Sequence, residues 1–142
     1  MCSAVWPHMV KRGGGAIVNM SSAAATGGLS PFMHRLSGRV PSASYSVGKA
    51  GVDALTRWTA GHGGESNIRV NGVRPGQIIT PLTDREGKGE HAFKKLFDVM
   101  QIIDGPGYPV DVANCVLFLS CNDSRFITGE IMNIDGGLPS KL

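Results

Sequence analysis

The apolar residues of this chain gather in short runs that polar and glycine-rich stretches separate. Three of these runs are brief and close to turn-forming residues: residues 16–20, 67–75 and 129–137. Brief apolar runs with β-branched side chains, bounded by turn signals, are typical of buried strands. The second run ends at Pro75, which has no amide proton to continue a central ladder. The pattern therefore predicts three strands.

The segments between these runs carry a helical period. Residues 42–60 are predicted to be a helix because their apolar residues recur at helical spacing: Val47, Ala50, Ala54, Leu55 and Trp58. Residues 109–120 open with a proline and an early aspartate, which favour a helix N-terminus. Residues 2–12 are typical of a helix end that the glycines at 13–15 stop, and the polar segment 84–100 has helical character. The region between residues 21 and 42 is expected to be a loop.

The order of strand, helix, strand, helix, strand indicates the fold class. Such alternation, with strands that are apolar almost throughout, favours an α/β fold with a parallel sheet covered by crossover helices. The length of 142 residues suits a single domain over residues 1–142. A three-stranded parallel sheet would leave its edges and much of its faces open. We therefore expect part of the fold to be missing from the chain.

Composition and charge exclude several classes of protein. The chain is 42% hydrophobic and 18% charged, with a formal net charge of +3 and basic residues that form no stripe. We therefore expect no nucleic-acid partner. No apolar run approaches the roughly 18 residues of a membrane span, so we also expect no membrane partner. Lys11 and Arg12 follow the N-terminal apolar residues, which is the wrong order for a secretory signal.

The cysteines and histidines are few and scattered. Three cysteines, an odd number without paired metal-ligand spacing, favour a reduced, cytoplasmic compartment. Four histidines are equally dispersed, so no metal site is expected.

Tyr45 and Lys49 are the first candidate for chemistry, because four residues along a helix place both side chains on one face. Alone, the pair is explained as well by a half-buried tyrosine and a solvated lysine. Ser22 follows the end of the first strand, and residues 74–80 (RPGQIIT) follow the end of the second. Strand C-termini are where parallel α/β sheets build their sites, although each feature alone also fits an ordinary turn.

Four phrases together resemble the C-terminal half of the classical short-chain dehydrogenase/reductase family: GGGAIVNMSS, YSVGKAGVDALTR, NIRVNGVRPGQIITP and FITGEIMNIDGG. The resemblance implies part of a Rossmann-like, doubly wound parallel sheet in which the three strands are neighbours. It also implies an oxidoreductase that depends on NAD or NADP and moves a hydride between nicotinamide and a small alcohol or carbonyl substrate. Members of this kind are expected to be homo-oligomers.

The resemblance also carries residue roles. By it, the catalytic residues would be Ser22, Tyr45 and Lys49. Tyr45 would exchange a proton with the substrate oxygen, to which Ser22 would donate a hydrogen bond. Lys49 would hold the nicotinamide ribose, and its charge would favour the ionised phenol. The residues expected to contact the cofactor are Tyr45, Lys49, Pro75, Gly76, Ile78 and Thr80.

The chain departs from the family pattern at its start. The glycine-rich turn that seats a dinucleotide follows a strand, whereas the glycines of RGGGA (12–16) precede one. We therefore expect the family's first four strands to be absent, residues 16–20 to form an open edge, and the isolated chain to bind NAD(P)H weakly and reduce no ketone at a useful rate. Two alternatives stay open: a non-catalytic remnant that acts through oligomerisation or partner binding, and an unrelated α/β binding domain.

A second departure is a longer spacing between Ser22 and Tyr45. Residues 31–41 have the look of an insertion over the mouth of the site. Its apolar side chains Phe32, Met33 and Leu36 either line a substrate pocket or belong to a surface loop without a role, and the sequence favours neither. The polar segment 84–104 corresponds to the family's variable substrate lid, and no substrate can be read from it.

Overall fold

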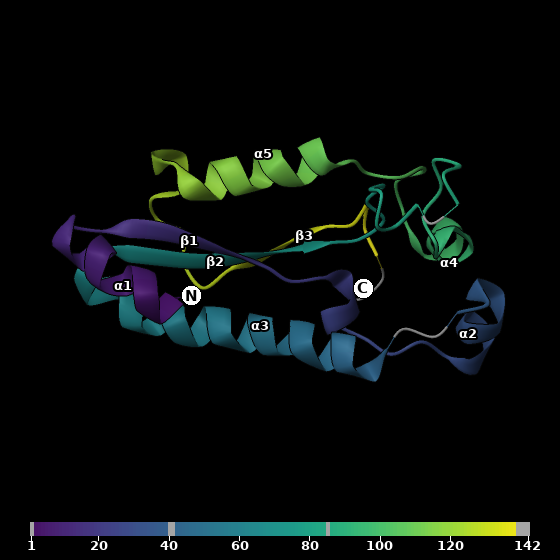
Figure 1. Cartoon of the computed structure of the whole chain (residues 1–142), viewed down its shortest axis with the longest axis horizontal. Coiled ribbons are helices and arrows are strands. Elements are labelled where there is room, and N and C mark those ends of the chain that lie inside the picture. The colour runs from purple at the N-terminus through teal and green to yellow at the C-terminus, as the bar shows by residue number, and fades with distance from the viewer. Residues whose placement is uncertain (1, 40–41, 85, 139–142) are drawn as a thin grey trace.

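A computed structural model of the chain describes residues 2–39, 42–84 and 86–138 (Figure 1). The α-helices are α1 (Cys2–Lys11), α2 (Pro31–Ser37), α3 (Ala43–Gly63), α4 (Lys94–Met100) and α5 (Pro109–Ser120). The strands are β1 (Gly15–Met20), β2 (Ile68–Pro75) and β3 (Ile131–Ile134). Short 3₁₀ turns lie at Ala23–Ala25 (η1), Gly64–Ser66 (η2) and Asn122–Ser124 (η3).

The three strands form one parallel sheet in the order β1-β2-β3. Gly15 pairs with Ile68 at the start of the first ladder, and Pro75 pairs with Ile134 at the end of the second. Figure 1 shows the sheet between two layers, with α5 over one face and α1 and α3 over the other. The predicted α/β fold with neighbouring parallel strands and covering helices is confirmed. All three strands point their C-terminal ends toward the same side of the molecule, which is where a site is expected.

The centre of the core lies along β2. Ile68, Val70 and Val73 on β2 and Leu119 on α5 are almost fully buried, with 0–2% of their surface exposed. Gly63 ends α3 against this strand, and a Cβ atom there would overlap the carbonyl oxygen of Ile68. Glycine at this position therefore allows the close approach between helix and sheet.

The apolar stripe predicted for α3 does not face the core. Val47, Leu55 and Trp58 are 71%, 47% and 66% exposed. The buried face instead carries Asp53, Thr56, Thr59, Ala60 and Gly63. The hydroxyls of both threonines donate to carbonyls four residues earlier on the helix, and Asp53 accepts hydrogen bonds from Arg74 on β2. The predicted helix is confirmed, and small and hydrogen-bonded residues, rather than its apolar stripe, make the sheet contact.

Two segments between the main elements also differ from prediction. The expected loop before α3 contains the helix α2, which Ser30 caps by accepting a hydrogen bond from the amide of Met33 and which ends at Gly38 in the left-handed region. In the polar segment 84–100, only Lys94–Met100 is helical. Asp84 accepts hydrogen bonds from the amides of Lys88 and Gly89, and this closes a turn where the helix was predicted.

No helix within the described ranges is long and apolar enough to cross a membrane. In the same ranges, no group of three or more His, Cys, Asp and Glu side chains is arranged to hold a metal ion.

Candidate active site

The C-terminal end of β1 is tied to α3 by two hydrogen bonds. The hydroxyl of Ser21 donates to the carbonyl of Lys49 at 3.1 Å, and the ammonium of Lys49 donates to the carbonyl of Met20 at 2.9 Å. The next residue, Ser22, caps η1, where its Oγ accepts a hydrogen bond from the amide of Ala24 at 3.2 Å. These contacts fix where Ser22 and Lys49 lie relative to each other.

Tyr45 lies one helical turn before Lys49 on α3. The ammonium of Lys49 lies 5.7 Å from the centre of the Tyr45 ring, which is within the range of a cation–π contact. Tyr45 is 50% exposed, and in the described part of the chain its hydroxyl has no hydrogen-bond partner. The phenol group is therefore open to a ligand, while the lysine beside it is held by the strand.

Ser22, Tyr45 and Lys49 line one cavity of about 1080 Å³, here called the apolar cavity. All the residues expected to contact a cofactor line it as well: Tyr45, Lys49, Pro75, Gly76, Ile78 and Thr80. The structure thus brings together all the residues that the sequence marked as catalytic or cofactor-binding candidates. Most of the remaining wall is apolar and comes from Leu29, Leu82, Phe93, Leu96, Phe97, Met100, Pro109, Val112 and Leu138.

The loop after β2 forms the wall opposite α3. A Cβ atom on Gly76 would lie 2.6 Å from the Cβ of Asp135, so only glycine fits between β2 and the turn after β3. The hydroxyl of Thr83 donates to the carbonyl of Ile78 at 2.7 Å and lies 3.0 Å from the hydroxyl of Thr80. Polar groups of this loop are therefore engaged with each other while Ile78 and Thr80 line the cavity.

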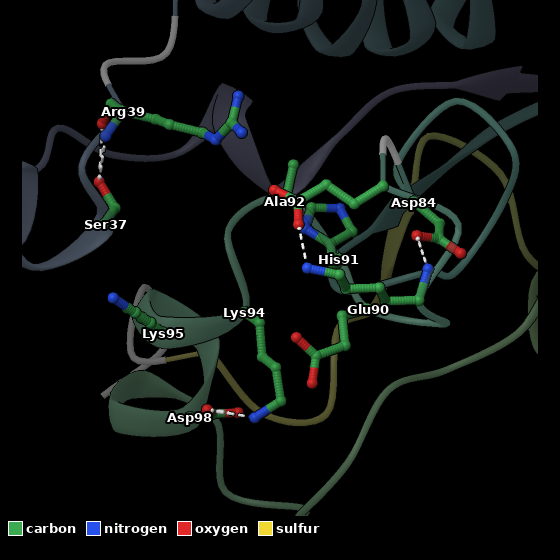
Figure 2. Close-up of a pocket in the computed structure, with 11 residues that line it drawn as sticks. Ser37, Arg39, Asp84, Glu90, His91, Ala92, Lys94, Lys95 and Asp98 are labelled. Atoms are coloured by element: carbon green, nitrogen blue, oxygen red, sulfur yellow. Dashed lines mark hydrogen bonds and ion pairs between the residues drawn. The ribbon is translucent and has the colours of Figure 1, made fainter.

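A second cavity of about 390 Å³, here called the charged cavity, shares part of its lining with the first. Figure 2 shows the residues that line it. Its lining comes from the end of α2, the turn after Asp84 and the start of α4: Ser37, Arg39, Asp84, Glu86, Lys88, Glu90, His91, Ala92, Lys94, Lys95 and Asp98. Lys88 pairs with Glu86 at 2.8 Å, and Lys94 pairs with Asp98 at 2.6 Å. Three residues line both cavities, namely Arg39, His91 and Ala92.

The charged groups of this second cavity shift one another's pKa values. A hydrogen bond from Lys88 lowers the pKa of Glu86, and a hydrogen bond to Asp98 raises the pKa of Lys94. His91 differs, because burial lowers its pKa. Its Nδ1 accepts a hydrogen bond from the amide of Phe93 at 3.1 Å, and its ring meets Phe97 edge-on with centroids 5.0 Å apart. Burial therefore favours the uncharged form of His91.

Comparison with known proteins decides the family. The family described as enoyl-(acyl carrier protein) reductase matches residues 1–139. The 3-oxoacyl-[acyl-carrier-protein] reductase FabG of Thermotoga maritima is 35% identical over 136 residues, which are 94% of this chain and 49% of that protein. The chain belongs to the short-chain dehydrogenase/reductase family.

Solved structures of short-chain dehydrogenases/reductases have the same arrangement of elements. A short-chain type dehydrogenase/reductase from Mycobacterium ulcerans superposes with a TM-score of 0.79 at 31% identity, over 96% of this chain and 46% of that one. A 7α-hydroxysteroid dehydrogenase solved with NADH and 7-oxo glycochenodeoxycholic acid superposes with a TM-score of 0.74 at 31% identity. The match covers 99% of this chain and 51% of that one. The chain thus spans about half the length of the proteins it matches, and it matches their C-terminal portion.

The segment that lengthens the Ser-to-Tyr spacing forms α2, and of its described residues only Ser37 and Arg39 at its end line either cavity. Phe32, Met33 and Leu36 line neither of the two cavities described, and Phe32 is 58% exposed. Of the two alternatives left open for these side chains, the pocket role gains no support from either cavity, and α2 packs against α4. Residues 40 and 41 of the segment lie outside the described residues.

Sequence reasoning also missed two residues of the site, Arg39 and His91. Arg39 lies in the segment already singled out for its unusual length, which was the available signal. His91 lies in the polar segment 84–104, whose folding over the cavity no local pattern predicts. Both become relevant only because two loops distant in sequence meet at the junction of the cavities.

Proposed function

We propose that this chain carries the catalytic and substrate-binding half of an oxidoreductase that depends on NAD or NADP and interconverts an alcohol and a carbonyl compound. One observation carries the proposal. Ser22, Tyr45 and Lys49 line the same cavity at the C-terminal ends of β1 and β2, in a chain of the short-chain dehydrogenase/reductase family. The apolar cavity exceeds the roughly 300–1,000 Å³ of most ligand pockets, so it has room for a substrate beside one end of a cofactor.

Tyr45 is the proposed acid and base. Its hydroxyl is exposed to the cavity and has no partner among the described residues, so it is available to a substrate oxygen. It would donate its proton to a carbonyl oxygen during reduction and accept one from an alcohol during oxidation. A positioned acid or base of this kind typically contributes about 10²–10⁴ to the rate.

Lys49 and Ser22 are proposed to support that transfer. The ammonium of Lys49, held at the carbonyl of Met20, lies close enough to Tyr45 to stabilise negative charge on the phenol oxygen as the proton leaves. Ser22 would donate a hydrogen bond to the substrate oxygen, because its hydroxyl proton is not used when Oγ caps η1 as an acceptor.

The residues present fit the nicotinamide end of a dinucleotide. Lys49 offers further ammonium protons to ribose hydroxyls, and the Thr80 hydroxyl and the second lone pair of the Ile78 carbonyl would serve a carboxamide. Pro75 and Gly76 shape the turn that carries them. When bound, the nicotinamide supplies or takes up the hydride. The relative solved with NADH supports this cofactor class, although it does not separate NAD from NADP for this chain.

A hybrid protein tests the proposal. In it, this chain replaces the matching half of the Thermotoga maritima reductase, so that the relative's remaining half is joined to the residues described here. We expect the hybrid to oxidise NADH or NADPH in the presence of a carbonyl compound. The Tyr45→Phe hybrid should bind the cofactor but lose at least about 100-fold in kcat. A folded hybrid that binds the cofactor and shows no Tyr45-dependent turnover would overturn the proposal.

A second role, association between copies of the chain, is favoured by the outer face of α3. Val47, Leu55 and Trp58 expose an apolar stripe there, and such patches on soluble proteins usually mark interfaces. We expect the chain to be at least a dimer by light scattering and Trp58→Lys to shift it toward the monomer. Arg57→Gln, an exposed polar change on the same helix, is the control. If the original chain and Trp58→Lys have equal masses, this face of α3 is not an interface between copies of the chain.

The expected compartment is the reducing cytoplasm. Cys2, Cys115 and Cys121 are free thiols in the structure, which supports a reducing environment. The substrate is proposed to be a small molecule, as in the 7α-hydroxysteroid dehydrogenase solved with 7-oxo glycochenodeoxycholic acid.

A further inference from the structure

Arg39 lies where the apolar and the charged cavity meet. Its backbone is fixed, because its amide donates to the hydroxyl of Ser37 at 3.2 Å and its carbonyl accepts from that hydroxyl at 2.7 Å. Its guanidinium, by contrast, has no hydrogen bond or ion pair with any residue that the structure describes. Figure 2 shows the side chain extending from the end of α2 toward the segment that carries His91 and Ala92. A half-buried cation without a fixed partner is therefore held at the junction.

The other cations of the charged cavity are placed differently. Lys88 and Lys94 are paired with Glu86 and Asp98, respectively. Lys95 is exposed and lines only the charged cavity. Arg39 is thus the one cation of this lining that also reaches the wall of the apolar cavity and has no ion pair among the described residues.

The carboxylates near Arg39 are already engaged or solvated. Glu86 feels the charge of Arg39 but forms its hydrogen bond with Lys88. Asp84 accepts two backbone amide hydrogen bonds in its turn. Glu90 is exposed to solvent, and a charge in that setting is strongly screened. An anion that enters from the apolar cavity therefore meets little competition for the guanidinium.

His91 adds a second donor at the junction. Its Nδ1 is occupied as an acceptor from the amide of Phe93, so the neutral ring keeps its proton on Nε2. Ala92, the third shared residue, has no polar side chain. The side chains at the junction therefore offer N–H donors and no acceptor, which suits an anionic group.

We propose that the substrate is an apolar alcohol or carbonyl compound that also carries an anionic group, and that Arg39 binds this group. This inference rests on the proposed function, because it places the reacting oxygen at Ser22 and Tyr45 in the same cavity. The apolar body would lie between these two points, against Leu29 and the lid residues Phe93 and Leu96. A planar guanidinium pairs well with carboxylates and phosphates, so either group meets the requirement.

Binding of three matched probes tests the inference. They are 6-acetyl-2-naphthoic acid, its uncharged methyl ester and 6-acetyl-2-naphthyl phosphate, titrated into the chain by fluorescence without a cofactor. We expect the chain to bind at least one of the two anions about tenfold more tightly than the ester. The Arg39→Leu variant should bind all three alike, whereas Arg39→Lys should keep part of the preference. Tighter binding of the acid would assign a carboxylate, and tighter binding of the phosphate ester would assign a phosphate.

Lys95→Leu is the matched control, because it removes an exposed cation that lines only the charged cavity. It should leave the ratio of anion to ester affinity unchanged. If Arg39→Leu fails to fold, salt provides the second test, since the preference of the unchanged chain should shrink as ionic strength rises. Equal affinity of the three probes, or a preference that Arg39→Leu preserves, would overturn the inference.

The Tyr45→Phe variant separates this inference from the proposed function. It should keep the full preference for the anions, because Tyr45 does not contact the anionic group in this arrangement. Should the hybrid enzyme show no Tyr45-dependent turnover while the preference persists and depends on Arg39, the function fails and the anion site stands. The reverse outcome, turnover without a preference, leaves the function and removes the anion site.

Discussion

The floor and the lid of the apolar cavity are built in contrasting ways. The floor comes from the strand ends, α3 and the turn after β2, where Asp53 and Arg74 form an ion pair whose side chains are only 6% and 14% exposed. The lid comes from the segment 84–104, where Lys94 and Asp98 pair at similar distance but are 43% and 46% exposed. The floor thus contains an ion pair shielded from solvent, whereas the ion pair of the lid is open to it.

Breaking the buried ion pair of the floor is expected to have the largest effect on stability. Asp53 Oδ2 accepts hydrogen bonds from both Nε and Nη2 of Arg74, and Asp53→Ala would leave that guanidinium buried without its partner. We expect a loss of about 3–5 kcal/mol in the free energy of unfolding. Asp98→Ala on the lid should lose less than about 1 kcal/mol, because exposed pairs contribute little. Urea denaturation of both variants measures the difference, and similar losses would erase the contrast between floor and lid.

Replacing a closely packed glycine of the floor is expected to have the next largest effect on stability. Gly76→Ala places a methyl group 2.6 Å from the Cβ and 2.7 Å from the Cα of Asp135, and the backbone of the floor cannot yield cheaply. We expect a loss of about 1–3 kcal/mol in the free energy of unfolding. Gly27→Ala, beside the same cavity, meets nothing within 4 Å and is the control. A Gly76→Ala chain as stable as the Gly27→Ala chain would show that the floor adapts.

The smallest effect concerns the pH dependence of the lid. Burial lowers the pKa of His91 below its ordinary value of 6.5, so the unfolded chain binds its proton more readily than the folded chain. The contribution of His91 to stability is therefore fully present above about pH 6.5 and declines as the pH falls below that value. Melting temperatures between about pH 7 and pH 5 should drop more for the original chain than for His91→Gln. If the melting temperatures of the two chains fall by the same amount as the pH is lowered, this account is contradicted.

The sequence predicted the floor better than the lid. Outside the lid, the helix α5 was predicted with the bounds that the structure has, and the proline and the early aspartate at its start were the signal. Tyr45 and Lys49 could be paired from spacing alone, since a helix converts sequence distance into spatial distance. The lid gave no such signal. The turn at Asp84 replaced a predicted helix, because side-chain hydrogen bonds to nearby amides compete with helical ones.

The inward face of α3 could not be predicted for a different reason. Periodicity identifies an apolar stripe, but it does not say whether that stripe meets the sheet or another surface. Here Thr56 lies against the sheet, where its Oγ1 accepts a hydrogen bond from the side chain of Asn19 on β1 at 2.9 Å. Trp58 lies on the outer face. Only the tertiary arrangement decides between the two faces.

A double-mutant cycle between Ser22→Ala and Tyr45→Phe, measured as kcat in the hybrid enzyme, tests the central claim most directly. If both side chains act on one substrate oxygen, the double variant should lose little more than Tyr45→Phe alone, because groups that act as a unit are not additive. Losses that simply multiply would mean that Ser22 and Tyr45 act independently, and this result would contradict the account.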